Sequence, residues 1–192
     1  MEWSVRSLTA ADAADIAAVF AASRRAAMPW LPVLHTPDED IVFFASEVES
    51  SCGWGVAVGG QLVGFVLTRD GWLNHLYVAP DWRGRGVGSA LLSRVVEGSI
   101  SAVDLWAFAR NEAALEFYAR HGFDVVERTD GSANEEREPD VQMRWTPNRR
   151  VRPARASDAE SLARVQVRSW QAASGPPCGE PSKAAGDPRS PA

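Results

Sequence analysis

A chain of 192 residues is long enough for one domain of ordinary size with a remainder, or for two small domains. Its 45% apolar composition, with eight tryptophans, excludes a disordered or fibrous protein. The formal net charge of -5 argues against a general nucleic-acid or anionic-membrane surface, because such binding requires many phosphates to be neutralised.

Several sequence features bear on where the protein works. The N-terminus lacks a basic region followed by an apolar one, so no signal peptide is expected, and no apolar run reaches the roughly 20 residues that cross a bilayer. Cys52 and Cys178 show neither metal-ligand spacing nor a framework of pairs, which fits a reducing compartment. We therefore expect a cytoplasmic protein without a metal site.

The first part of the chain predicts two helices and an antiparallel meander. Thr36, Pro37 and Glu39 give a strong helix start, with a capping threonine, a proline at the first helical position and a glutamate at the third. The pair Gly59-Gly60 is typical of a two-residue hairpin turn. The expected elements are strands at 5–8, 54–58, 61–68 and 72–78, and helices at 13–24 and 36–50.

A glycine-rich turn follows the last strand of this meander and opens a helix. Residues 83–88 read RGRGVG, and Ala90, Leu91, Leu92 and Val95 follow at helical spacing. The first N–H groups of a helix lack partners within the helix and carry the positive end of its dipole, and glycine lets the main chain approach an anion. The turn is therefore expected to hold a phosphate, with two arginines as countercharge.

The next part predicts a crossover to a parallel strand. The apolar run 103–108 suits a central strand covered on both faces, and the helix before it is long enough to place that strand parallel beside 72–78. Asn111 caps a further helix, which Gly122 ends. Closing strands are expected at 123–128 and 141–145, with a polar, acidic loop at 129–140 between them.

After Pro147 the chain changes character. Residues 151–169 can be laid on residues 5–23 at a constant offset, with identities such as Val5/Val151 and Asp12/Asp158, which predicts a truncated second copy of the opening strand and helix. The alternative is a chance match between alanine-rich segments. The predicted organisation is a domain at 1–147, a partial repeat at 148–171 and a disordered tail, rich in Pro, Gly, Ala and Ser, at 172–192.

The pattern Arg83-x-x-Gly86-x-Gly88, after a strand that ends Leu-Tyr-Val-Ala-Pro, resembles the acetyl-CoA-binding motif of the GNAT family of N-acetyltransferases. The resemblance covers residues 2–146 and is strongest over 73–122. It implies an α+β fold with α/β/α layers, the GNAT acyl-CoA N-acyltransferase fold. In that fold a mixed, mostly antiparallel sheet has a splayed parallel pair of central strands, and acetyl-CoA enters the gap between them as co-substrate.

The resemblance also implies roles for individual residues. Leu76, Tyr77 and Val78 would make main-chain contacts to the acetyl group and the pantetheine arm. Asn111 would bond the pantetheine arm, and Tyr118, two helical turns along the same face, would protonate the leaving thiolate as a general acid. The pyrophosphate would be held by the turn, which comprises Arg83, Gly84, Arg85, Gly86, Val87 and Gly88.

Neither the base nor the acceptor is identified by these motifs. His75 is the obvious titrating group near the site, but alternation along the strand puts it on the face of Leu73 and Tyr77, so water-relayed deprotonation is an alternative. The acidic residues of 135–140 either attract a cationic amine or form a solvated loop.

The expected function is transfer of the acetyl group of acetyl-CoA to a primary amine of a small molecule by direct attack. One alternative is a catalytically idle GNAT-fold binding or regulatory module. A less favoured one is a dinucleotide-binding oxidoreductase with Asp104 as its ribose acid, but the glycines read G-x-G-x-G instead of G-x-G-x-x-G. The expected partner is the small amine, without nucleic acid or membrane, and a homodimer is left open.

Overall fold

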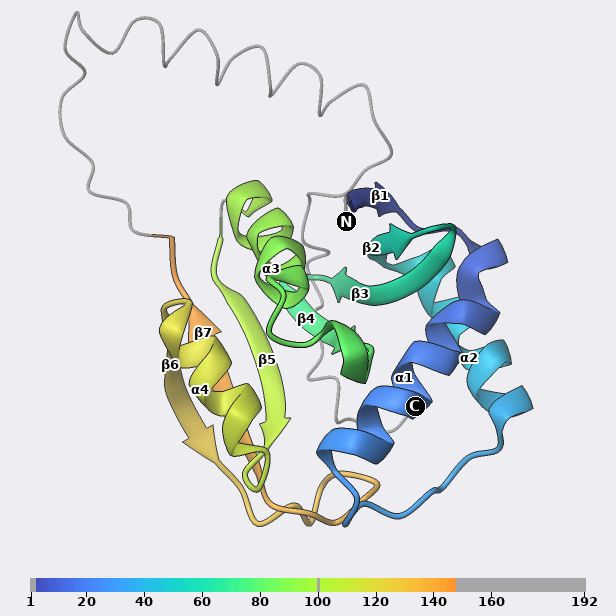
Figure 1. The fold of residues 1–192 in the computed structure, drawn as a ribbon. Coiled ribbons are helices and arrows are strands. Elements are labelled where there is room, and N and C mark those ends of the chain that lie inside the picture. The colour runs from blue at the N-terminus through green and yellow to red at the C-terminus, as the bar shows by residue number, and fades with distance from the viewer. Residues whose placement is uncertain (1–2, 100, 148–192) are drawn as a thin grey trace, which may run out of the picture.

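The computed structural model describes residues 3–99 and 101–147, which fold around one seven-stranded sheet in the order β1-β2-β3-β4-β5-β7-β6 (Figure 1). The strands are β1 (Ser4–Ser7), β2 (Cys52–Val58), β3 (Gln61–Arg69), β4 (Trp72–Val78), β5 (Val103–Phe108), β6 (Phe123–Arg128) and β7 (Asp140–Trp145). The helices are α1 (Ala13–Ala27), α2 (Pro37–Ser50), α3 (Val87–Gly98) and α4 (Glu112–Arg120), with short 3-10 turns η1 (Ala10–Asp12) and η2 (Pro80–Trp82).

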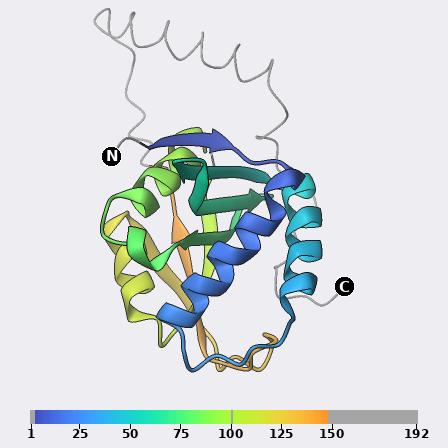
Figure 2. The same cartoon turned by 45° about the vertical axis from the view of Figure 1, so that its right-hand side comes forward.

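Helices cover both faces of the sheet, and β3 shows why. Its side chains alternate between two buried clusters, because successive residues of a strand point to opposite faces. Phe65 and Leu67 pack with Ile16 of α1 and Phe44 of α2. Val66 packs on the other face, against α3 and α4. Figure 1 and Figure 2 both show α1 and α2 side by side.

The sheet consists of two antiparallel halves that meet at one parallel pair. β1 to β4 form the first half, and β5, β7 and β6 form the second. Between β4 and β5 the ladder holds a single residue pair, Trp72 opposite Asp104, where the Asp104 N–H donates to the Gly71 carbonyl at 2.9 Å. Beyond this pair the two strands diverge. The expected mixed sheet with a splayed parallel pair is confirmed.

A β-bulge in β4 changes which side chains share a face. Leu67 lies opposite His75 and Thr68 lies opposite Leu73, so Asn74 is the extra residue on β4. Leu73 therefore packs in the cluster under α3, whereas His75 contacts Phe44 on the face of α1 and α2. The prediction that Leu73 and His75 share a face is wrong, because simple alternation assumes an uninterrupted strand.

The predicted helix starts are visible as side-chain caps. The Thr36 hydroxyl accepts a hydrogen bond from the Glu39 N–H at 3.3 Å, and Glu39 Oε2 accepts one from the Thr36 N–H at 2.7 Å. At the start of α4, Asn111 Oδ1 accepts from the Ala114 N–H at 3.3 Å. These reciprocal bonds fix where α2 and α4 begin, and α4 carries one of the predicted site residues.

Several expectations fall outside what the described residues can address. The partial repeat at 148–171 and the tail at 172–192 lie beyond them. In residues 3–99 and 101–147 no helix is long and apolar enough to span a bilayer, and no group of His, Cys, Asp and Glu could hold a metal ion. Cys52 is not a free thiol, which corrects its interpretation as an isolated one. The cytoplasmic location and the homodimer stay predictions.

Candidate active site

A cavity of about 390 Å³ opens where β4 and β5 diverge. Residues 73–77 of β4 and 106–108 of β5 line its two long walls. On one face of the sheet it is lined by Asn111, Ala114 and Tyr118, and elsewhere by Met28, Phe43, Glu47, Arg69, Asn134 and Asp140. We call the part formed by residues 83–120, with α3 and α4, the donor side. The part formed by α2, His75 and the β6–β7 loop is called the acceptor side.

Tyr118 lies on the donor side, where its ring is held between aromatic neighbours. The ring centroids of Phe117 and Phe123 lie 5.3 and 5.5 Å from that of Tyr118, and the residue is only 8% exposed. Burial raises the pKa of the Tyr118 phenol above its ordinary value, and the nearby Tyr77 raises it further. Tyr118 therefore keeps its proton at neutral pH, as a proton donor in this cavity must.

Tyr77 also lines this cavity, whereas the sequence analysis assigned a role only to its main chain. Its ring packs against Phe20 at 5.0 Å and Phe65 at 5.7 Å, and burial raises its pKa as well. The alternation of side chains along β4 could have predicted that the Tyr77 ring lines the gap, because each side chain beside a splayed strand pair borders the gap on one face or the other.

The edge of β4 that faces β5 carries peptide groups without a ladder partner beyond Trp72. The Ala79 N–H donates to the Val63 carbonyl at 2.9 Å, so Ala79 turns its N–H toward β3. Peptide groups alternate in direction along a strand, so Tyr77 also directs its own toward β3. Leu76 and Val78 direct theirs toward the gap. Of the three predicted main-chain contacts, these two have the required direction, whereas the main chain of Tyr77 faces β3.

The glycine-rich turn leaves the first amides of α3 uncapped. Gly84 and Gly86 have φ of +69° and +83°, in the left-handed region that favours glycine. A Cβ at either position would meet no atom within 4 Å, so packing does not require glycine at these positions. The positive φ is the reason that glycine is favoured there. Gly86 is the N-cap of α3 and has no side chain to occupy the helix amides. The turn can therefore present these amides to an anion.

The two arginines of the turn have different surroundings. Arg83 Nη2 donates to the Ser23 carbonyl at 2.9 Å and to the Ser23 hydroxyl at 3.0 Å, which ties the turn to α1. Partial burial lowers the pKa of Arg83. The Arg85 guanidinium lies 5.1 Å from the centroid of the Trp82 ring. The guanidinium of Arg83 is therefore bound to α1, whereas that of Arg85 lies against the Trp82 ring.

On the acceptor side, His75 and Glu47 face each other. His75 Nε2 lies 3.8 Å from Glu47 Oε2, and Arg69 Nη1 binds Glu47 Oε1 at 3.0 Å. Burial, together with the smaller effect of the Arg69 charge, lowers the pKa of His75 to about 4, so the imidazole is neutral at pH 7. Glu47 was missed in the sequence, although it lies three residues after Phe44 and thus on the buried face of α2.

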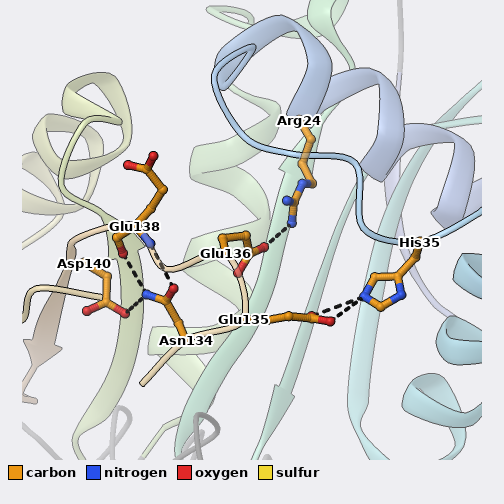
Figure 3. Close-up of polar contacts among 7 residues, drawn as sticks. All are labelled: Arg24, His35, Asn134, Glu135, Glu136, Glu138 and Asp140. Carbon is orange, nitrogen blue, oxygen red and sulfur yellow. Dashed lines mark hydrogen bonds and ion pairs between the residues drawn. The ribbon is translucent and has the colours of Figure 1, made fainter. Parts of the chain in front are cut away.

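The β6–β7 loop contributes to the acceptor side and contacts α1 and the segment after it (Figure 3). Glu136 binds Arg24 of α1 at 2.9 Å, and Glu135 lies 3.1 Å from His35 in the segment after α1. Asn134 Nδ2 donates to Asp140 Oδ2 at 3.1 Å, and both residues line the cavity. The loop is therefore only partly a solvated acidic loop, because Glu136 is largely buried and paired with Arg24 of α1, whereas Glu135 stays 62% exposed.

The competing dinucleotide site is not present in these residues. Arg144 Nε binds Asp104 Oδ1 at 2.8 Å and Gln142 Nε2 donates to the same oxygen at 3.1 Å. Asp104 also lies within β5 beside its parallel pairing with Trp72, not at the end of the strand. Its carboxylate is thus engaged inside the sheet, where a ribose could not reach it.

Comparison with protein families identifies the part of the chain that builds the donor side. Residues 49–125 match the family model described as an acetyltransferase (GNAT) domain. An uncharacterized N-acetyltransferase of Methanocaldococcus jannaschii is 35% identical over 89 residues, covering 38% of this chain and 39% of that protein. N-acetylaspartate synthetase of Danio rerio is 32% identical over 119 residues, covering 56% and 42%. Peptidyl-lysine N-acetyltransferase YiaC of Escherichia coli is 33% identical over 75 residues, covering 38% and 51%. The chain thus matches about half or less of each relative's length.

Solved structures match a larger part of the chain. The apo form of YjaB from Escherichia coli superposes with a TM-score of 0.64 at 23% identity, covering 76% of this chain and 98% of that one. The paia N-acetyltransferase of Thermoplasma acidophilum, solved in complex with coenzyme A, gives 0.62 at 20% identity, covering 77% and 100%. At these identities the likeness shows the fold. The chain therefore has the GNAT fold, and its residues 49–125 match the acetyltransferase (GNAT) domain.

Proposed function

We propose that the protein transfers the acetyl group of acetyl-CoA to a primary amine. The observation that carries the proposal is the single residue pair between β4 and β5. Because the strands diverge beyond this pair, a cavity opens between them, and the buried Tyr118 lines it. The uncapped amides of α3 after Gly86 lie on the same side of the sheet as Tyr118. One face thus offers both a place for phosphates and a proton donor.

The groups that acetyl-CoA requires have counterparts here. The gap-facing peptide groups of Leu76 and Val78 would bond the acetyl carbonyl and the pantetheine amides. The turn at 83–88 would hold the pyrophosphate through α3 amides, with Arg85 beside it. Asn111 lines the cavity, and although its Oδ1 caps α4, its Nδ2 is the group left for the pantetheine arm.

Tyr118 would protonate the sulfur as the thioester breaks. When a neutral amine attacks the acetyl carbon, a C–N bond forms, the C–S bond breaks and the electron pair stays on sulfur. A phenol held in the cavity can give its proton to that thiolate. Burial strengthens the case, because the site that raises the pKa of Tyr118 also disfavours a free thiolate.

We propose that the acceptor is a small molecule. The relatives' names include both N-acetylaspartate synthetase and a peptidyl-lysine N-acetyltransferase, so similarity alone supports neither class over the other. The support comes from the acceptor side, where α2 and the β6–β7 loop, which is ion-paired to α1, border the cavity. The volume of the cavity is about 390 Å³, which suits a small acceptor. A folded protein tail would have to displace that loop.

Thermal unfolding with added ligands tests the donor. Coenzyme A and acetyl-CoA should raise the unfolding midpoint, whereas NADH should not, since a ligand stabilises only the state that it binds. Release of the coenzyme A thiol is then followed with a panel of free amines and a lysine-containing peptide. Stabilisation by coenzyme A without release on any amine would indicate an idle binding module, and stabilisation by NADH alone would indicate the oxidoreductase.

A further inference from the structure

The end of the cavity near α2 contains a carboxylate oxygen, Glu47 Oε2, for which no hydrogen bond is recorded among the described residues. Glu47 is largely buried, with 12% of its side chain exposed, and Arg69 holds its Oε1. Among the residues that the structure describes, the nearest group recorded for Oε2 is His75 Nε2 at 3.8 Å, which is too long for a hydrogen bond. His75 is neutral, so it does not compete for this oxygen as a cation.

A second unengaged acceptor borders the same cavity. Asn74 Oδ1 is buried and has no hydrogen-bond partner among residues 3–99 and 101–147. Asn74 is the bulge residue of β4, so the bulge places its side chain at the point where the strands part. Leaving a buried acceptor without a partner costs about 1–3 kcal/mol, so a ligand's N–H group would gain most at Asn74 Oδ1.

These two acceptors fit one kind of ligand. A primary ammonium carries a positive charge and three N–H donors, which match a carboxylate oxygen and an amide oxygen. The neighbouring wall is apolar, since Phe43 lies against the His75 ring with centroids 5.8 Å apart and remains half exposed. An aromatic or aliphatic body could pack on Phe43 while its amine reaches the polar end.

Resting on the proposed function, we propose that Glu47 and Asn74 bind the acceptor's amine, and that the acceptor is a small primary amine with an apolar or aromatic body. Glu47 Oε2 then also takes the first proton from the ammonium. The neutral nitrogen attacks the acetyl carbon, and it loses a second proton when the amide forms. One proton ends on the sulfur of coenzyme A through Tyr118, and the other leaves Glu47 for solvent, so the reaction is balanced.

The test compares the wild-type protein with Glu47→Gln, using 2-phenylethylamine, butylamine and a lysine-containing peptide as acceptors. Glu47→Gln keeps the shape but removes the charge. We expect it to raise KM for 2-phenylethylamine by about 10- to 100-fold, the usual effect of losing a hydrogen bond to a charged group, while KM for acetyl-CoA stays the same. The wild-type protein should use 2-phenylethylamine more efficiently than the peptide.

Two controls separate charge recognition from damage to the fold. Glu49→Gln changes an exposed glutamate of the same helix that does not line the cavity, and its kinetics should equal those of the wild type. The neutral analogue 2-phenylethanol should inhibit wild type and Glu47→Gln equally, because it carries no ammonium. Unfolding midpoints of both variants confirm that the fold is kept.

The failures of the two proposals are distinguishable. Unchanged KM for 2-phenylethylamine in Glu47→Gln overturns the assignment of Glu47 and leaves the acetyltransferase proposal intact. Preference for the peptide overturns the substrate class. If no amine releases coenzyme A, the proposed function fails. Calorimetric measurement of 2-phenylethylamine binding to the coenzyme A-bound protein then tests the amine-binding site by itself. Weaker binding to Glu47→Gln than to the wild type supports the site, and equal or absent binding overturns it.

Discussion

The donor side and the acceptor side of the cavity are built in different ways. The donor side comes from one continuous stretch of chain, residues 83–120, which lies wholly within the matched residues 49–125. The acceptor side brings together α2, His75 of β4 and the β6–β7 loop, and much of it lies outside that match. The proposed donor site is thus local in the sequence, whereas the proposed acceptor site depends on tertiary contacts between distant segments.

The sharpest test of the donor side is Tyr118→Phe. The variant keeps the ring between Phe117 and Phe123 but removes the proton donor, so kcat should fall by about 100-fold, at the lower end of general-acid effects, with KM for acetyl-CoA unchanged. The chain has two tyrosines, which provides a matched control. Tyr77→Phe should reduce kcat by less than about tenfold, and the opposite ranking in steady-state assays would move the acid role to Tyr77.

A smaller effect is expected at the glycine-rich turn. Gly86→Ala forces a left-handed residue to carry a Cβ, at a cost of about 1–2 kcal/mol, and should raise KM for acetyl-CoA by about tenfold as the turn relaxes. Gly98→Ala is its control at the other end of α3, where a Cβ also meets open space but φ is not positive. Equal KM values in the two variants would contradict a role for the turn's conformation.

The difference between the two sides of the cavity explains which features could be predicted from the sequence. Glycine at 84 and 86, the Asn111 cap and the spacing to Tyr118 are local features, so the fold and the donor side could be predicted. The bulge at Asn74 could not, because one inserted residue leaves the apolar pattern of β4 almost unchanged. Nor could the pairing of Glu136 with Arg24, which joins residues more than a hundred positions apart.

On the acceptor side, the Arg24–Glu136 ion pair should be measurably coupled. Both side chains are mostly buried, at 22% and 14% exposed, so a double-mutant cycle with Arg24→Gln and Glu136→Gln should give about 1 kcal/mol from urea unfolding. The exposed Arg120–Glu116 pair is the control and should give less than about 0.5 kcal/mol. Both Arg24→Gln and Glu136→Gln should raise KM for the amine and not for acetyl-CoA, and the reverse would place the loop on the donor side.

The smallest expected effect belongs to His35 and Glu135. The Glu135 carboxylate raises the pKa of His35 above 6.5, so the pair adds stability that is complete below pH 6.5 and is lost as the pH rises through the folded-state pKa. The side chains are 51% and 62% exposed, so solvent screening limits the gain to a few tenths of a kcal/mol, about the median for surface pairs. His35→Gln should therefore lower the free energy of unfolding slightly at pH 5.5 and not at pH 8.5. A large loss of unfolding free energy at both pH values would mean that His35 stabilises the β6–β7 loop by packing. Arg24 would then not be the main attachment of that loop to the first half of the molecule.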